Sequence, residues 1–219
     1  MALLSEQGDY LERSIQTDRR HAEVLPGLLD AILEEACATW PQIELIAVSI
    51  GPGSFTGLRV GLSFAKGLAV GIGCPIAPVD TLYALAEQFY RNQSIVREHS
   101  GRFSLCPLVP ARKAEAFGQL YKADDKGIVI DEEPMLVDRA KAEELMGQGV
   151  MLFGEGGKLL WLSSEETSNF IGDFNASAMT IAQLGRKQWL LNPASLQPAS
   201  SLEPRYLKEF TVTVKKQTL

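Results

Sequence analysis

The chain has 219 residues, of which 46% are hydrophobic and 22% charged, a composition typical of a globular protein with one or two buried cores. Its formal net charge of −6 at pH 7 argues against a protein that grips nucleic acid unaided, because neutralising phosphates requires clustered Lys and Arg. The three widely spaced cysteines, the lack of a secretory leader and the interruption of the longest apolar run by Lys66 together predict a cytoplasmic protein without a membrane span.

The first 72 residues predict a hairpin followed by a helix, a strand and a second helix. Residues 2–15 contain two short apolar runs around the turn Glu6-Gln7-Gly8-Asp9, which is a hairpin pattern. Residues 21–40 predict an amphipathic helix, and residues 43–50 predict a strand that runs into a Gly-Pro-Gly turn. The apolar face of the first helix is made by Leu25, Leu28, Leu29, Ile32, Leu33 and Ala36.

The Gly-rich turn after this strand is the most informative segment of the chain. Gly51 and Gly53 allow backbone conformations that other residues resist, and either Ser54 or Thr56 is expected to cap the following helix. A strand, a glycine turn and a helix N-terminus together suit an anion site, but no Gly-Lys-Ser/Thr follows and the G-x-G-x-x-G spacing is missing. The turn therefore has two interpretations, a tight structural turn or a phosphate cradle.

The helix predicted over 57–72 has two apolar ridges. One ridge contains only small residues and the other bulky ones, and interior glycines at 61, 67 and 71 each lower helix stability by up to about 1 kcal/mol relative to Ala. Glycine is useful where another backbone approaches closely, either within this chain or from another protein. The small ridge is Gly57, Gly61, Ala65 and Ala69, and the bulky ridge is Val60, Phe64, Leu68 and Ile72.

The rest of the chain alternates strands and helices, which predicts an α/β class. Strands are expected at 75–79, 103–109, 115–122, 128–130 and 150–153, and helices after Asp80 or Thr81, from Asp138 to about Met146, and over 175–191. A polar stretch at 91–102 marks a lobe boundary, so we expect a first lobe at 1–101, a second at 102–174, and a C-terminal helix and tail at 175–219.

The sequence lacks the common catalytic motifs. Its only histidines, His21 and His99, have neither H-E-x-x-H nor H-x-x-x-H spacing, so we expect no metal site and no cofactor built on histidine. No G-x-S-x-G elbow is present either, since Ser54 falls one place too late for that motif. Catalytic residues are therefore not predicted.

Several segments resemble the bacterial TsaB (YeaZ) family. Residues 49–61, with the sequence SIGPGSFTGLRVG, closely resemble its signature, and residues 65–69 and 75–79 match as well. In the second lobe, residues 110–117 are similar to the family's Asp-Ala-Arg-Arg-x-Glu-Val-Tyr segment, although Pro110 stands where the family commonly has Asp. Residues 202–207 resemble its closing Glu-Pro-x-Tyr-Leu.

The resemblance implies a two-lobed ASKHA (actin-like, ribonuclease H-like) fold. It also implies a non-catalytic subunit in the synthesis of threonylcarbamoyladenosine (t6A) in tRNAs that read codons beginning with A. Such a subunit pairs through helices with a TsaD-type catalytic subunit and activates it. A TsaE-type ATPase completes the complex, and the subunit contacts tRNA only as part of that complex. The implied partner-binding residues are Leu25, Leu28, Leu29, Ile32, Gly57, Val60, Gly61, Phe64, Ala65 and Leu68, and the turn residues are Gly51, Gly53, Ser54 and Thr56.

The resemblance also has a gap and leaves alternatives. Family members begin with a strand and a short Asp-Thr/Ser turn ahead of the first hairpin, whereas Met1 lies inside that hairpin here. The missing strand would lie next to Val48 and carry the first phosphate loop, which argues against nucleotide binding. The alternative functions are an M22-type peptidase and a stand-alone nucleotide-binding protein, and the alternative assembly is a homodimer in the absence of a TsaD-type partner.

Overall fold

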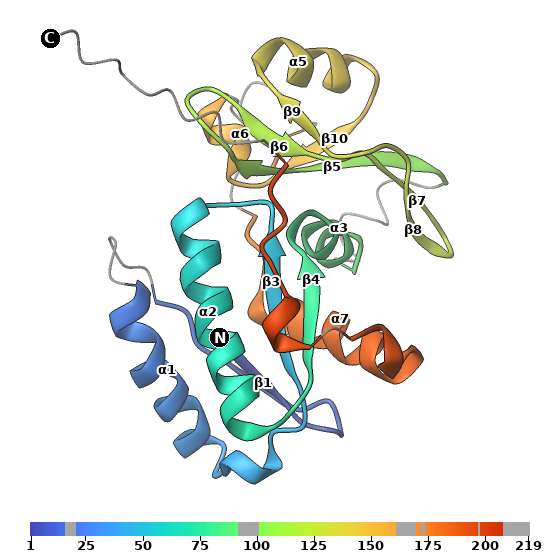
Figure 1. The fold of residues 1–219 in the computed structure, drawn as a ribbon. Coiled ribbons are helices and arrows are strands. Elements are labelled where there is room, and N and C mark those ends of the chain that lie inside the picture. Colours follow the sequence, from blue (N-terminus) through green and yellow to red (C-terminus); the bar gives the residue numbers. More distant parts are fainter. Residues whose placement is uncertain (16–20, 92–100, 161–169, 172–173, 197, 208–219) are drawn as a thin grey trace, which may run out of the picture.

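The computed structural model describes residues 1–15, 21–91, 101–160, 170–171, 174–196 and 198–207. These residues form two α/β lobes, one above the other in Figure 1. The first lobe contains the N-terminal half of the described chain together with the last long helix, and the second contains most of the remaining strands. The two-lobed α/β architecture predicted from the resemblance is confirmed.

The strands of the first lobe form two separate pairs among the described residues. β1 (Ala2–Leu4) and β2 (Tyr10–Glu12) make an antiparallel hairpin in which Leu3 lies opposite Leu11. β3 (Ile46–Gly51) and β4 (Ile76–Asp80) are parallel, with Ile46 opposite Ile76. No hydrogen-bonded ladder joins the hairpin to β3 in the part of the chain that the structure describes.

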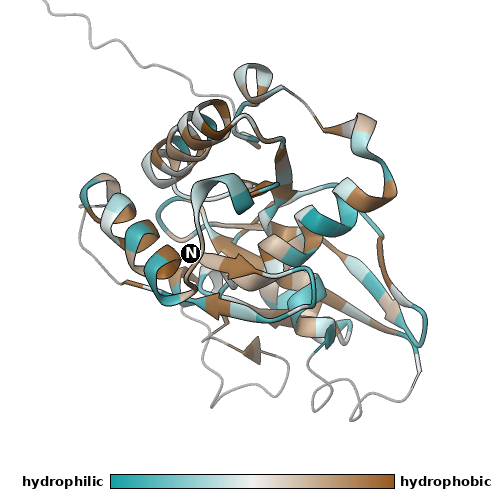
Figure 2. Cartoon of the chain, turned by 90° about the horizontal axis from the view of Figure 1, so that it is seen from below, coloured by the Kyte–Doolittle hydropathy of each residue, from teal (hydrophilic) through white to brown (hydrophobic). Residues whose placement is uncertain are grey.

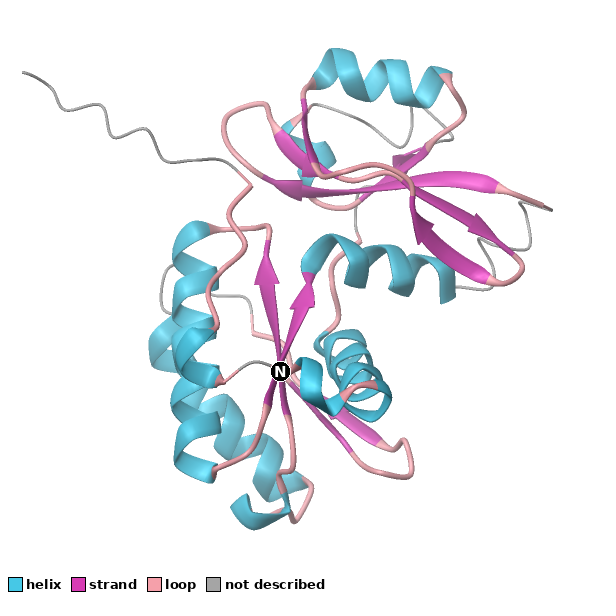
Figure 3. Cartoon of the chain, turned by 45° about the vertical axis from the view of Figure 1, so that its right-hand side comes forward, coloured by secondary structure: helices cyan, strands magenta, loops and turns pink. Residues whose placement is uncertain are grey.

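Helices cover the strands of the first lobe (Figure 3). α1 (His21–Glu35) packs against α2 (Phe55–Ile72), and α2 packs in turn on β3. α7 (Ala178–Leu191) packs against β1, β3 and β4, so it holds both strand pairs. The chain after α1 forms a short 3₁₀ helix, η1 (Trp40–Gln42), before β3 begins.

The second lobe is built on a larger sheet, which has seven described strands. Its centre is β5 (Phe103–Pro110), which pairs in parallel with β10 (Met151–Phe153) and antiparallel with β6 (Ala116–Gly118) and β7 (Tyr121–Asp124). The outer strands are β8 (Gly127–Ile130), β9 (Met135–Val137) and β11 (Phe170–Ile171). α5 (Arg139–Gly147) and the single turn α6 (Gly156–Leu159) pack against strands of this sheet.

The two lobes meet around α3 (Thr81–Arg91). Leu82, Leu85 and Phe89 of α3 are buried with Leu105 and Phe153 of the second-lobe sheet, and the rings of Phe89 and Phe153 stack with centroids 4.0 Å apart. After α7 the chain forms two further 3₁₀ turns, η2 (Pro193–Ser195) and η3 (Ala199–Ser201), and then runs upward between α2 and β4 (Figure 1).

Most of the expected elements are present, with several differences. The first helix ends at Glu35 rather than near residue 40, and Cys37 beyond it has a positive φ of 50°. The single strand expected at 115–122 is split into β6 and β7, which pair with different halves of β5. The short strands β9 and β11 were not expected. The boundaries expected at 101/102 and 174/175 stay predictions.

Candidate partner-binding site on helix α2

The C-terminal part of the chain packs against the Gly-rich turn. Gly51 is buried and has a φ of 112°, a conformation that favours glycine. A Cβ at this position would lie 2.9 Å from the carbonyl oxygen of Arg205, and the Arg205 N–H donates to the Ile50 carbonyl oxygen at 2.7 Å. The space beside the turn is therefore occupied by backbone of the same chain, which favours the structural interpretation over a phosphate cradle.

The first turn of α2 is capped by Ser54 rather than by Thr56. The Ser54 Oγ accepts a hydrogen bond from the Gly57 N–H at 3.3 Å, which satisfies one of the amides left free at a helix start. Thr56 lies exposed inside the first turn of α2. Gly53 sits closer to the second lobe, since a Cβ there would be 3.9 Å from Val109.

One side of α2 belongs to the interior of this chain. Leu62, Ala65 and Ala69 are buried in a cluster with Ile76 and Leu202. Their spacing of three and four residues places them on one stripe of the helix, and that stripe faces β3 and β4. Half of the small-residue ridge thus serves packing within the first lobe.

The opposite side of α2 is open. We call Val60, Phe64, Gly67, Val70 and Gly71 the open face, because their spacings of three and four residues place them on adjoining rows of the helix. Val60 and Phe64 are half-buried, Gly67 and Gly71 are exposed, and the Val70 side chain is 72% exposed. A Cβ added at Gly61, Gly67 or Gly71 would meet no atom within 4 Å, so no described residue of this chain uses these glycines for close packing.

The helix is also unusually apolar for one so little covered. By length and composition alone α2 could cross a membrane, yet only 17% of its 18-residue apolar window is buried. Figure 2 shows the same property by colour, since α2 is mostly white and brown whereas α1 beside it carries teal residues. We interpret α2 as a helix of the folded lobe, because its buried stripe packs on β3 and its two cations contact the C-terminal segment.

The partner-binding residues expected from the sequence divide into two groups. Ile32 is 1% exposed and Ala65 is 6% exposed, so both belong to this chain's own core. The expectation that these two side chains contact a partner directly is therefore corrected. The other expected residues are half-buried, which leaves part of each accessible: Leu25, Leu28, Leu29, Gly57, Val60, Gly61, Phe64 and Leu68. Gly67, Val70 and Gly71 were missed, although the interior glycines were a signal for them.

The titratable groups buried away from α2 have the properties of core residues. Burial raises the pKa of the Cys106 thiol to about 12, against a smaller opposing effect of a hydrogen bond with the Gln119 backbone. Burial likewise raises the pKa of Tyr121, whose hydroxyl donates to Gln119 Oε1 at 2.8 Å. Within the described ranges, no three His, Cys, Asp or Glu side chains gather closely enough to hold a metal ion.

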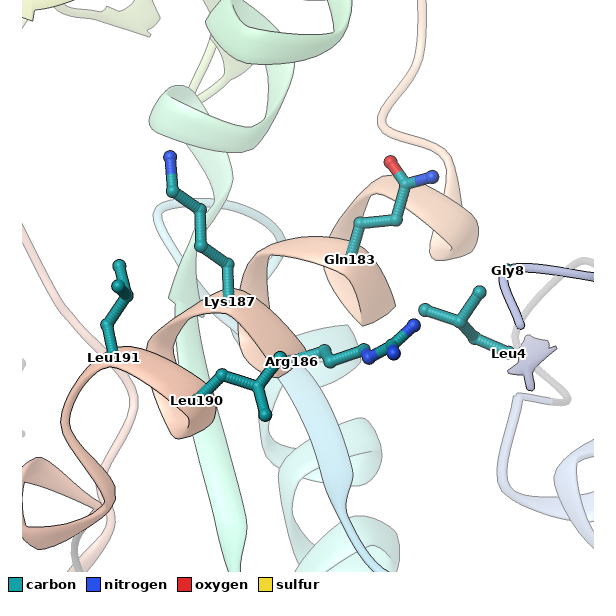
Figure 4. A pocket seen from close by; sticks show the side chains of 7 residues that line it. All are labelled: Leu4, Gly8, Gln183, Arg186, Lys187, Leu190 and Leu191. Carbon is teal, nitrogen blue, oxygen red and sulfur yellow. The ribbon is translucent and has the colours of Figure 1, made fainter. Parts of the chain in front are cut away.

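A hollow lies between the first hairpin and α7 (Figure 4). Its volume is about 320 Å³, and the side chains of Lys187, Leu190 and Leu191 rise from the helix on its border. Arg186 closes one side by donating to the backbone carbonyl oxygens of Ser5 and Glu6 at 3.2 and 2.7 Å. None of the residues expected to function lines this hollow, and the Arg186 guanidinium is hydrogen-bonded to the backbone of the hairpin.

Comparison with known proteins agrees with the fold and with the glycine-rich signature. The family model described as TsaD, tRNA N6-adenosine threonylcarbamoyltransferase, matches residues 15–180. The chain is 26% identical over 208 residues to the tRNA threonylcarbamoyladenosine biosynthesis protein TsaB of Haemophilus influenzae, covering 90% of this chain and 84% of that protein. It is 31% identical over 115 residues to TsaB of Escherichia coli K12, covering 52% of this chain and 47% of that protein.

A solved structure matches over nearly the whole chain. YeaZ from Pseudomonas aeruginosa superimposes with a TM-score of 0.73 at 23% identity, covering 94% of this chain and 92% of that one. At this identity the likeness supports the fold, while the family follows from the sequence matches. The chain therefore belongs to the TsaB (YeaZ) family of TsaD-like proteins.

Proposed function

We propose that this protein is the non-catalytic subunit of a tRNA t6A modification complex. In this role it binds a TsaD-type catalytic subunit through the open face of α2 and the adjoining half-buried residues of α1, and so activates that subunit. A TsaE-type ATPase and the tRNA meet it only within the complex, in the cytoplasm. The names of its TsaB relatives support the pathway, and the net charge of −6 is consistent with an indirect role toward tRNA.

The observation that carries this proposal is the empty space beside the glycines of α2. Gly67 and Gly71 each lower helix stability by up to about 1 kcal/mol relative to Ala, and no described residue of the chain approaches them. A helix face with glycines and exposed Val70 allows a second helix to come close, because interaxial distance depends on side-chain size at the contact. We therefore favour a protein partner over a small molecule as its occupant.

The alternative functions have less support. A peptidase would need an activated nucleophile, but the Ser54 Oγ accepts a hydrogen bond from its own helix, and the His21 side chain lies outside the described residues. A nucleotide at the Gly-rich turn would have to displace Arg205, whose backbone fills the space beside Gly51. Neither alternative accounts for the open face.

The test is binding of the TsaD-type protein from the same organism to purified variants of the full chain. Val70→Asp places a charge on the open face, and Gly67→Trp fills the space above it, so we expect each to weaken binding at least tenfold and to lower t6A formation in a reconstituted reaction. Ala65 is not suitable for this test, because a larger side chain there would disturb the chain's own core.

Val129→Asp is the matched control, since Val129 is 62% exposed but lies on β8 of the second lobe. It makes the same chemical change on a different surface and should bind as the wild type does. If Val70→Asp and Gly67→Trp both bind the TsaD-type protein with wild-type affinity, the open face is not the contact. Peptide hydrolysis that Ser54→Ala abolishes would instead support the peptidase.

A further inference from the structure

The C-terminal segment 198–207, which we call the strap, holds α2 by two cations of the helix. The Lys66 ammonium donates to the carbonyl oxygens of Ser200 and Leu202 at 3.2 and 2.9 Å. Nearer the start of the same helix, the Arg59 Nε donates to the Tyr206 hydroxyl at 2.8 Å. The strap therefore contacts α2 near its first turn and again near its middle.

The strap is itself anchored at the carboxyl ends of β3 and β4. The Arg205 N–H donates to Ile50 at the end of β3, and the Arg205 guanidinium pairs with Asp80 at the end of β4, 2.6 Å from Nη1 to Oδ2. The Leu202 side chain, 4% exposed, is buried against Leu62 and Ala65. The strap thus links α2 to the rigid strands of the first lobe along the border of the open face.

Helix α2 needs such support more than most helices. Its three interior glycines lower its intrinsic stability, and no described atom of the chain would lie within 4 Å of a Cβ at Gly67 or Gly71 on the open face. A helix that is loosely held in the free protein must be ordered when a partner binds, and that ordering reduces the affinity. Contacts that fix the helix beforehand therefore increase the affinity without touching the partner.

We propose that Lys66 and Tyr206 are positioning residues for the docking of α2, acting through the strap, so that the strap and the partner are thermodynamically coupled. This inference rests on the proposed function, because it assumes that a protein docks on the open face. Coupling is reciprocal: if an intact strap tightens partner binding, partner binding must stabilise the strap by the same free energy.

The experiment compares Lys66→Met, which keeps most of the side-chain length but removes the donor, with Lys187→Met, an exposed lysine on α7. Amide hydrogen exchange is measured on the free full-length chain, and affinity is measured with the TsaD-type protein. We expect Lys66→Met to speed exchange in α2 and to weaken binding about tenfold, while Lys187→Met changes neither. In the wild type, partner binding should slow exchange at the Arg205 amide, which lies at the strand end of the strap.

Tyr206→Phe is the second variant, because it removes one hydroxyl from a side chain that is 40% exposed and leaves the ring in place. It should shift exchange and affinity in the same direction, by a smaller factor. Wild-type affinity in both strap variants, together with weakened binding by Val70→Asp, would overturn the strap inference and leave the proposed function standing. Wild-type affinity of Val70→Asp and Gly67→Trp would overturn the proposed function, whatever the strap variants show in exchange.

Discussion

Gly185 on α7 and Ala47 on β3 approach so closely that a Cβ on Gly185 would lie 2.5 Å from the Cβ of Ala47. The same added atom would be 3.2 Å from the Cβ of Ala77 on β4. Helix α7 therefore packs directly on both strands at a point where neither partner has more than a methyl group. We expect Gly185→Ala to lower the free energy of unfolding by about 1–3 kcal/mol through overpacking, measured by urea denaturation.

The opposite result is expected for a glycine on the open face. Gly71→Ala adds a methyl group where no atom lies within 4 Å, so it should raise the free energy of unfolding by up to about 1 kcal/mol through helix propensity. The same urea titration measures it. A destabilising Gly71→Ala would contradict the open space at this position.

Asp80 combines two roles at the junction of β4 and α3. Its Oδ1 accepts from the Tyr83 N–H at 2.9 Å and caps α3, while its Oδ2 pairs with Arg205. Asp80→Ala should therefore lower the free energy of unfolding by about 1–2 kcal/mol, because cap and pair are lost together. Asp80→Asn retains a capping oxygen and should be affected less, and thermal unfolding of the two variants distinguishes them.

The exposed and buried cysteines should differ in reactivity over a wide pH range. Cys37 is exposed, whereas burial raises the pKa of Cys106 to about 12. At pH 8.5 we expect iodoacetamide to modify Cys37 in the native chain and to leave Cys106 unmodified, as measured by peptide mass spectrometry. Rapid modification of Cys106 under these conditions would show that the second-lobe core is open.

The same raised pKa gives the sign of an alkaline effect on stability. Because the thiol of the unfolded chain loses its proton near its ordinary pKa of about 9 while the folded one keeps it, the contribution to folding is complete below pH 9. It declines as the pH rises from 9 toward 12. Cys106→Ala should flatten this part of the profile of unfolding free energy against pH, after allowance for Tyr121, whose pKa is raised too.

Local sequence signals predicted the helix starts well. Ser54, Asp80 and Asp138 each accept a hydrogen bond from the first turn of the helix that follows, as their residue types indicate. The division of 115–122 into two strands was not predictable, because residues on either side of Gln119 alternate in the same way and only their pairing partners differ. Strands of two or three residues, such as β11, show no periodicity to read.

The expected partner-binding residues need two corrections, because Ile32 and Ala65 belong to the core, and the rest of that site stays a prediction. The two ridges of α2 were visible in the sequence, but their spacing alone does not say which one meets the sheet, and Ala65 proved to be on that side. The contact between Arg205 and Asp80 joins positions 125 residues apart, for which a single sequence contains no signal. The contacts that hold the tail on α2 were accordingly not expected.

The separation of the hairpin from β3 has a consequence for the order in which the parts of the molecule unfold. Apolar residues of β3 are only half-buried, whereas Leu105, Cys106 and Leu108 of β5 are fully covered between neighbouring strands on both edges. We therefore expect the described part of the first lobe to unfold as a smaller cooperative unit than the second. Limited proteolysis under mild conditions is expected to cut first in the half that contains the hairpin and α1, and to leave the seven-stranded sheet as the resistant fragment.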